Sequence, residues 1–293
     1  MATKTLRFFN ETPVIPGFSL SFGFSTFYLS LIILLPISAL WLYVSDMSWA
    51  QYWQAISDRR VVQSYWVTAS GAFYSTVAAT FVGFVLAWVI TRYEFPGRRL
   101  IDALVDLPFA LPTSVAGLTL ATLFVPGGWL GQWFAGDGFI GQWFGPEGLK
   151  ISYAYPGIVL AMTFTSLPFV VRIVQPVMED LGAEYEEAAQ TLGANKWQIF
   201  WRVILPSLIP ATVTGASQAF IRSLGEFGAV IMIAGNIPFK TEVTSLMIFV
   251  RLQEFNYPAA AAIASVILLA SLVLLFLLQL AQSHLLGWQR NKK

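Results

Sequence analysis

Six long apolar stretches constrain the fold of this chain more than any other feature of its sequence. They cover residues 24–44, 66–90, 104–125, 155–175, 208–234 and 259–281. A helix rises about 1.5 Å per residue, so each stretch can cross the roughly 30 Å of hydrocarbon in a bilayer. Because 56% of the 293 residues are hydrophobic, a soluble domain of this length could not bury them all. The sequence predicts an all-α, polytopic membrane protein with six transmembrane helices in a single domain, residues 1–293.

Composition excludes several other classes of protein. The 17 Lys and Arg balance 16 Asp and Glu without forming a basic block, so no nucleic-acid partner is expected. There is no cysteine, and His284 is the only histidine, so the chain is expected to bind no metal or cofactor itself. The stretch 24–44 exceeds the roughly 7–15 residues of a signal-peptide core, and we expect it to remain as a span.

The distribution of positive charge predicts that both termini are cytoplasmic. With that orientation the inside segments carry eleven Lys and Arg: Lys4, Arg7, Arg92, Arg98, Arg99, Arg172, Lys196, Arg202, Arg290, Lys292 and Lys293. The outside segments carry five: Arg59, Arg60, Lys150, Lys240 and Arg251. An outside loop also repeats the tetrapeptide Gly-Gln-Trp-Phe at 131–134 and 141–144. We interpret it as an aromatic belt at the membrane surface, with ligand contact as the alternative.

A polar loop at residues 176–207, on the inside in this topology, is predicted to form two short helices. Gly193 is placed to end the first helix with positive φ, Asn195 can cap the second, and Pro206 is expected to stop it. The second helix presents one aromatic and apolar face, made of Trp197, Phe200, Trp201 and Ile204. Such a face suits docking into a groove of another protein, or lying flat on a lipid surface.

The same loop resembles the EAA loop of ABC importer permeases. Glu187-Ala188-Ala189, Gly193 and Val203-Ile204-Leu205-Pro206 match the pattern E-A-A, three residues, G, nine residues, I-x-L-P, with Val203 the one departure. The resemblance implies the ABC type I importer permease fold and a loop that couples to an ATPase subunit. It implies that Glu187 contacts the ATPase, that Ala188 and Ala189 pack closely, that Gly193 forms the turn, and that Leu205 and Pro206 complete the motif.

A second set of candidate residues lies in the fifth predicted span, where Gln218, Arg222 and Glu226 recur every four residues and Ser223 adjoins them. A charge at mid-span costs roughly 2.5–3.5 kcal/mol, so Arg222 should face the bundle interior with Glu226 as its partner. The pair is either structural, locking helices together, or part of an anion translocation path.

Two segments, 220–229 and 106–117, resemble the sulfate and molybdate branch of these permeases. In the second, Pro108 and Pro112 break the third span, as a gate or a plain kink would. Asp102 and Asp106 lie four residues apart there, and we expect Arg98 or Arg99 to pair with them. Residues 16–23 and 255–261 resemble the T-type subunit of sulfate/thiosulfate importers.

The resemblance implies a non-catalytic permease subunit in a bacterial plasma (inner) membrane that carries sulfate or thiosulfate. The implied partners are a W-type permease, an ATPase dimer that binds ATP, and a periplasmic sulfate-binding protein. The chain has no Gly-x-x-x-x-Gly-Lys-Ser/Thr phosphate loop, so ATP would be hydrolysed on the partner. The alternatives are the same machine for molybdate, tungstate or another oxyanion, a stand-alone secondary transporter, and a structural membrane scaffold.

Overall fold

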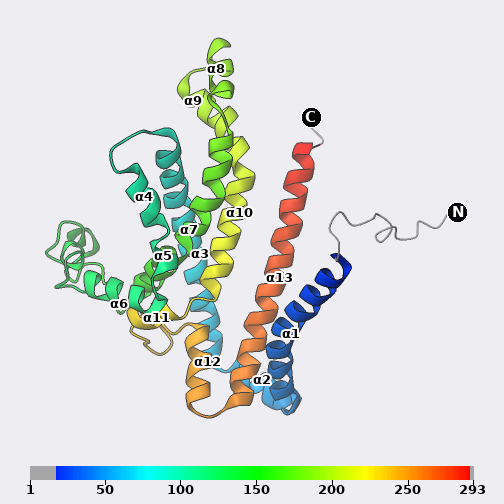
Figure 1. Ribbon diagram of the computed structural model, residues 1–293. Helices are drawn as coiled ribbons and strands as arrows, with labels where there is room; N and C mark the ends of the chain where they lie inside the picture. The colour runs from blue at the N-terminus through cyan, green and yellow to red at the C-terminus, as the bar shows by residue number, and fades with distance from the viewer. Residues whose placement is uncertain (1–17, 291–293) are drawn as a thin grey trace.

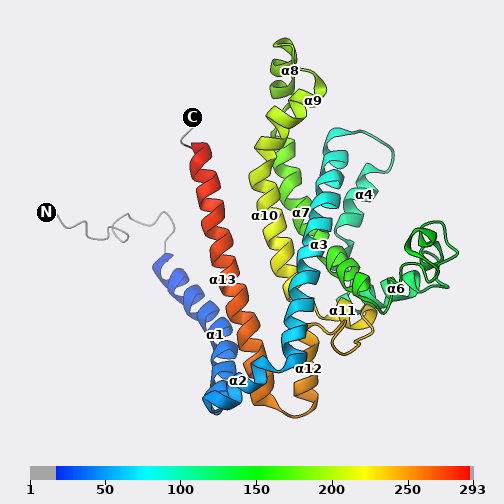
Figure 2. The same cartoon turned by 180° about the vertical axis from the view of Figure 1, so that it is seen from behind.

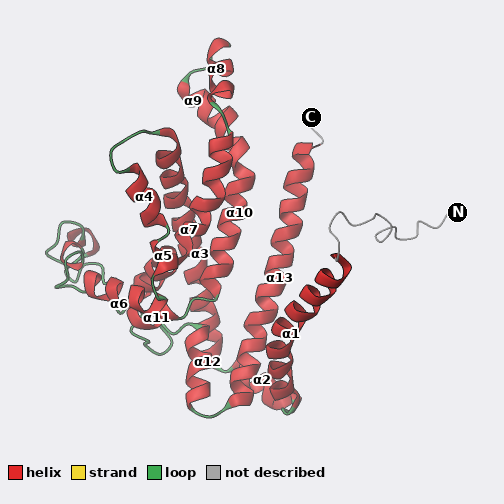
Figure 3. Ribbon diagram, in the orientation of Figure 1, coloured by secondary structure: helices red, strands yellow, loops and turns green. Residues whose placement is uncertain are grey.

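The computed structural model describes residues 18–290, and the side chains of residues 20–280 apart from Ala183. All regular structure within these residues is helical, which confirms the all-α prediction (Figure 3). The α-helices are α1 (Phe18–Ser45), α2 (Trp49–Ser57), α3 (Arg59–Arg92), α4 (Arg98–Val105), α5 (Leu107–Ala110), α6 (Thr113–Phe124), α7 (Tyr155–Asp180), α8 (Ala183–Thr191), α9 (Lys196–Ile199), α10 (Leu205–Leu224), α11 (Gly228–Ile233), α12 (Thr244–Gln253) and α13 (Tyr257–Arg290). Three short helical turns are η1 (Gly131–Trp133), η2 (Gly141–Phe144) and η3 (Phe200–Ile204).

Five helical segments of the described chain are long and apolar enough to cross a bilayer: α1, α3, α7, the run from α9 to α10, and α13. The third predicted span, 104–125, is instead divided among α4, α5 and the shorter apolar helix α6. Leu111 is extended, with φ −89° and ψ 136°, because the ring of Pro112 disfavours helical geometry in the residue before it. The expected proline break is therefore a true interruption of the helix.

The predicted limits of the fifth span, 208–234, are wrong at both ends. Pro206 does not stop the helix, because it lies in the first turn of α10, where a missing N–H is tolerated. The π-helical turn η3 precedes it, so α9, η3 and α10 run on without a break. At the other end α10 stops at Leu224, and a turn at Gly225 separates it from α11.

The core of the bundle is formed by α3, α7 and α10, which lie side by side in both views (Figures 1 and 2). The buried face of α3 is made largely of small residues, including Ser75, Ala79, Gly83 and Ala87. A Cβ atom on Gly83 would lie 2.9 Å from the Cβ atom of Val170 in α7. Small residues thus let these helices approach closely, as in other membrane bundles.

The helices α1 and α13 form an outer pair beside this core (Figure 1). Tyr43 and Tyr257 stack with ring centroids 6.0 Å apart where the two helices meet. In both views the last turns of α13 point towards the end of the bundle that carries α8 and α9, opposite α2 and α12 (Figure 2). Of the terminal basic residues used for the topology, Lys4, Arg7, Lys292 and Lys293 lie outside the described residues.

The repeated tetrapeptide is also a structural repeat, located in the loop beside α6. Gln132 Nε2 donates to Trp129 O and Gln142 Nε2 donates to Phe139 O, each at 3.0 Å. Both turns leave a tryptophan exposed, Trp133 at 52% and Trp143 at 81%. This exposure fits the interpretation as an interfacial aromatic belt, which stays a prediction.

Candidate coupling hairpin and translocation path

The α8–α9 hairpin forms the tip of the bundle, at the top of Figure 1. Gly193 ends α8 with φ +85°, and its N–H donates to Gln190 O at 2.9 Å. Asn195 caps α9 by accepting from the Gln198 N–H at 2.9 Å, and the Gln198 side chain accepts from the Asn195 N–H. The predicted glycine turn and asparagine cap are both confirmed. Local signals therefore set the turn and the helix cap of the hairpin.

The residues of the EAA motif are divided between the surface and the interior of this hairpin. Glu187, Ala188 and Gly193 are exposed. Ala189 is partly buried and packs against the hydrophobic core that α3, α7 and α10 share. Leu205 is half-buried and Pro206 exposed, both at the start of α10. The hairpin thus presents a free acidic surface at its tip.

The expected aromatic face of the second helix is not a single exposed stripe. Ile204 is only 3% exposed and belongs to the core. Phe200 contacts Trp88 of α3 edge-to-face, with ring centroids 5.4 Å apart. Trp197 and Trp201 remain exposed, at 70% and 50%. The prediction is wrong at Ile204 because the helix packs directly on the bundle there, so the stripe attaches the hairpin to α3.

An ion pair that the sequence did not predict provides a second attachment between the hairpin and α3. Arg92, at the end of α3, lies 2.9 Å from Glu186 of α8 and donates to Leu181 O at 3.1 Å. Its guanidinium also lies over the Trp88 ring, 5.8 Å from the centroid. The sequence does show a basic residue at the end of a span and, separately, an acidic hairpin. It does not show that the two are paired, because they lie far apart in the chain. The hairpin is therefore attached to α3 by an ion pair as well as by aromatic packing.

The predicted path residues lie where α10 ends. Arg222 and Glu226 form an ion pair at 2.7 Å, although Glu226 lies beyond the helix rather than on its face. The Glu226 carboxylate is 1% exposed and accepts from the Ala229 N–H at 3.0 Å. Ser223 is buried and receives a hydrogen bond from Ser75 of α3 at 3.1 Å. The expected partner of Arg222 is confirmed, but the shared helical face is not.

Gln218 and the two prolines occupy different environments. Gln218 is exposed one turn before Arg222. Pro108 is buried in α5, whereas Pro112 is exposed immediately before α6. The structure brings α6 against α11, so the segments after Pro112 and after Glu226 meet in space. These are the two segments that carry the resemblance to oxyanion permeases.

Two glycines permit this contact between α6 and α11. A Cβ atom on Gly117 would lie 2.3 Å from Ala229 O, and one on Gly228 would lie 2.2 Å from Thr113 Oγ1. Ser114 is also close to Gly228. The sequence did not predict these contacts, although Gly117 and Gly228 lie in the segments 106–117 and 220–229. A side chain at Gly117 would meet the backbone of Ala229 and push the helices apart, whereas one at Gly228 would require the Thr113 side chain to move.

We therefore expect Gly117→Ala to destabilise the protein by about 1–3 kcal/mol, the typical cost of overpacking a tight contact. The midpoint of thermal unfolding of the purified protein should fall by several degrees. Gly127→Ala is the matched control, since nothing lies within 4 Å of a Cβ atom there. Equal midpoints for the two variants would show that the close contact is not required.

The acidic pair in α4 and α5 has a different partner from the one expected. Arg172 of α7, rather than Arg98 or Arg99, lies 2.6 Å from Asp102 and 2.7 Å from Asp106. Arg172 also donates to the backbone carbonyl of Asp102 at 2.7 Å. The prediction is wrong because α7 packs against α4 and α5 and brings Arg172 to both carboxylates, a contact between residues 66 and 70 positions apart in the chain. Arg172 thus fixes the interrupted third segment to the bundle core.

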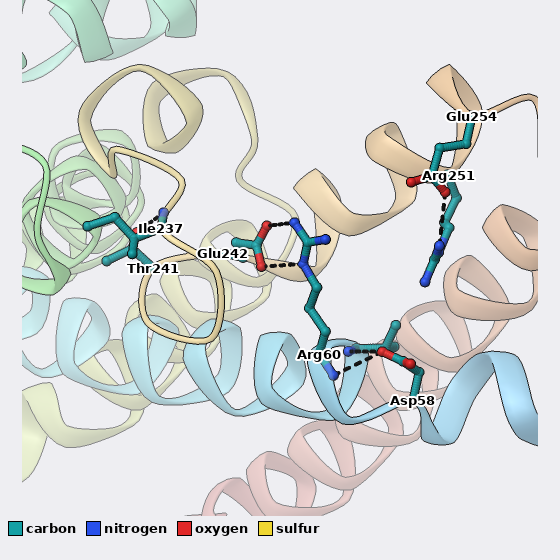
Figure 4. Close-up of polar contacts among 8 residues, drawn as sticks. Asp58, Arg60, Ile237, Thr241, Glu242, Arg251 and Glu254 are labelled. Carbon is teal, nitrogen blue, oxygen red and sulfur yellow. Dashed lines mark hydrogen bonds and ion pairs between the residues drawn. The ribbon is translucent and has the colours of Figure 1, made fainter.

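At the opposite end of the bundle, a charged pair closes the junction between α3 and α12. Figure 4 shows Arg60 reaching Glu242 with two nitrogens, and the Nε contact is 2.8 Å. Asp58 accepts from the Arg60 N–H at 2.9 Å and so caps α3. Arg251 pairs separately with Glu254 at 2.9 Å. Glu242 is 3% exposed and the Arg60 side chain 36%, so the ion pair joins a buried carboxylate to a partly exposed guanidinium.

Solved structures share this fold. A bacterial ABC transporter that imports the acidic polysaccharide alginate matches with a TM-score of 0.72 at 17% identity, covering 91% of this chain and 95% of that one. A chain of the MetNI methionine ABC transporter matches with a TM-score of 0.57 at 16% identity, covering 82% and 99%. The likeness establishes the ABC type I permease fold.

The sequence comparisons establish the family. Residues 79–290 match the model of the binding-protein-dependent transport system inner membrane component, and the chain belongs to that family. It is 59% identical over 271 residues to the sulfate transport system permease protein CysT of Escherichia coli (strain K12), covering 92% of this chain and 94% of that one. It is 44% identical over 255 residues to CysT of Synechocystis sp., covering 87% and 86%.

Proposed function

We propose that this chain is a permease subunit of a sulfate/thiosulfate importer, powered by ATP that a partner subunit binds and hydrolyses. The observation that carries the proposal is the 59% identity to a sulfate permease over 92% of this chain. The contact between α6 and α11 supports it, because the two oxyanion-type segments meet there. In the path, Arg222 would offset the charge of a passing anion, and Glu226 would prevent the anion from being trapped.

The coupling part of the proposal assigns residues 176–207 to the ATPase. Glu187 and Ala188 would form the exposed contact at the hairpin tip, and Gly193 would hold the turn between its helices. Ala189, Leu205 and Pro206 would join the hairpin to the bundle. The links from Arg92 to Glu186 and from Trp88 to Phe200 support transmission of movement from the hairpin to the spans.

The assembly that this function requires contains a second, W-type permease, an ATPase dimer and a periplasmic sulfate-binding protein. The hairpin would face the cytoplasm of a bacterium, with both termini on the same side of the inner membrane. The path would lie between the two permeases, lined by Gln218 and Arg222 of this chain, with Ser223 buried behind them against α3 and with Pro108 and Pro112 shaping the interrupted third segment. ATP binding would close the ATPase dimer and move the hairpins.

The proposal is tested by purifying the chain from its native membrane with the subunits that accompany it, and measuring sulfate uptake in liposomes. We expect an ATPase and an anion-binding protein to co-purify, and uptake to require ATP. Competition by thiosulfate, but weak competition by molybdate and tungstate, would assign the cargo. Uptake by the chain alone, driven by an ion gradient, would instead establish a secondary transporter and overturn the scheme.

A further inference from the structure

An apolar groove of about 370 Å³ lies between α3 and α9, on the outside of the bundle. Its lining consists of Phe84, Val85, Trp88, Lys196, Trp197 and Phe200. The rings support one another, because Phe84 stacks on Trp88 and Trp197 stacks on Phe200, with centroids 6.4 and 6.2 Å apart. The edge-to-face contact of Trp88 with Phe200 joins the two walls. The groove is therefore a preformed feature of the fold.

The groove continues an exposed apolar stripe along α3. Phe73, Val77, Phe81 and Val85 recur every four residues and are 57%, 55%, 71% and 45% exposed. Residues at this spacing share one face of a helix. Because α3 is long and apolar enough to span the bilayer, such a face is suited to acyl chains. The stripe runs from mid-helix to the groove.

The rim of the groove carries a positive charge that suits a lipid headgroup. Lys196 lines it and, within the described residues, forms no ion pair. Arg92, by contrast, is engaged with Glu186 and the Leu181 carbonyl. Tryptophans such as Trp197 favour the level of the headgroups, with their rings on the apolar side. Apolar walls below a free ammonium group are complementary to an anionic amphiphile.

We propose that this groove binds one phospholipid with an anionic headgroup. An acyl chain lies along the α3 stripe and between the aromatic walls, and the Lys196 ammonium holds the phosphate. The site adjoins the attachment of the hairpin to α3, so an occupied groove stabilises the Trp88–Phe200 contact. The groove shares no residue with the proposed path. Lys196, Trp197 and Phe200 belong to the loop 176–207, on the side of the hairpin that packs against α3.

Native mass spectrometry of the purified complex tests the proposal, with phosphatidylglycerol and phosphatidylcholine as probes in matched mixed micelles. We expect wild-type protein to retain more phosphatidylglycerol than phosphatidylcholine. Lys196→Glu should lower its retention about fivefold or more, since one lysine near an anionic surface contributes roughly that factor. Val85→Trp should lower retention of both lipids by filling the groove. Matched controls are Lys240→Glu, an exposed lysine in another loop, and Val82→Trp, on α3 outside the groove lining.

Three outcomes would overturn the proposal. The first is equal retention of the two lipids by wild-type protein. The second is loss of lipid in the control variants to the same extent as in Lys196→Glu and Val85→Trp. The third is protection of Trp197 from a water-soluble quencher only when the ATPase is bound, because a protein surface would then cover the groove. Unchanged thermal unfolding midpoints of the variants would establish that any lipid loss is local.

Discussion

Gly193→Val is expected to lower sulfate uptake by up to about five- to thirtyfold while the chain still inserts in the membrane. Gly193 has φ +85°, a conformation that a β-branched residue adopts only with strain. The strain costs about 1–2 kcal/mol. It would lower the population of the present turn, relative to other loop conformations, by about five- to thirtyfold. Nothing lies within 4 Å of a Cβ atom at this position, so the effect comes from the backbone and not from a clash. ATP-dependent uptake in liposomes is the measurement.

Two further variants separate this strain from other effects. Gly193→Asn should retain most of the uptake, because asparagine tolerates left-handed backbone. Gly182→Val is the matched control in the same hairpin, since Gly182 has φ −57° and also has open space around it. Normal uptake by Gly193→Val would remove the coupling role of the hairpin. Equal losses in Gly193→Val and Gly182→Val would point to general disruption of the loop.

Arg222→Gln is expected to destabilise the protein by about 3–5 kcal/mol, because it leaves the Glu226 carboxylate buried without its cation. Glu226 is 1% exposed and has one further hydrogen bond to its carboxylate, from the Ala229 N–H. The thermal unfolding midpoint and the amount of assembled complex should both fall. Uptake alone could not distinguish a path residue from a structural one, since loss of assembly also stops transport.

The double variant Arg222→Gln/Glu226→Gln resolves this ambiguity. It removes both charges and keeps a side chain of similar size at each position, so assembly and thermal stability should recover. If Arg222 serves the path, sulfate uptake stays at least about tenfold below wild type despite normal assembly. Recovery of uptake together with stability would assign the pair a purely structural role. Ser217→Ala, which loses only a hydrogen bond within α10 to the Val213 carbonyl, controls for local perturbation of α10.

Local signals in the sequence predicted the hairpin well. The turn at Gly193 and the cap at Asn195 depend on residues within one or two helical turns, and both formed as expected. The partner of Arg222 was also near in sequence. The limits of the fifth span were predicted wrongly, because Pro206 sits in a first helical turn, where it is tolerated, and Gly225 ends α10 before Glu226.

Contacts between distant segments were beyond the reach of pattern reasoning. The pairing of Arg92 with Glu186 depends on how α3 and α8 meet, and the pairing of Arg172 with Asp102 and Asp106 depends on how α7 packs against α4 and α5. Periodicity gives the face of a helix, but not the neighbour that covers it. Ile204 illustrates this, since its spacing placed it on an outward stripe and packing placed it in the core.

The uninterrupted run from α9 to α10 makes a rod of 29 residues, Lys196–Leu224. At 1.5 Å per residue it is about 43 Å long, so a tilt of about 5° at the hairpin would displace its far end by about 3–4 Å. Arg222 is part of this rod, whereas Glu226 lies beyond its end. The Glu226 carboxylate accepts a hydrogen bond from the Ala229 N–H, and its backbone carbonyl accepts one from the Ser245 hydroxyl. Tilting the rod would therefore draw the cation away from its counter-ion. We expect one position of the rod to hold Arg222 neutralised, and another to release its charge for a passing anion.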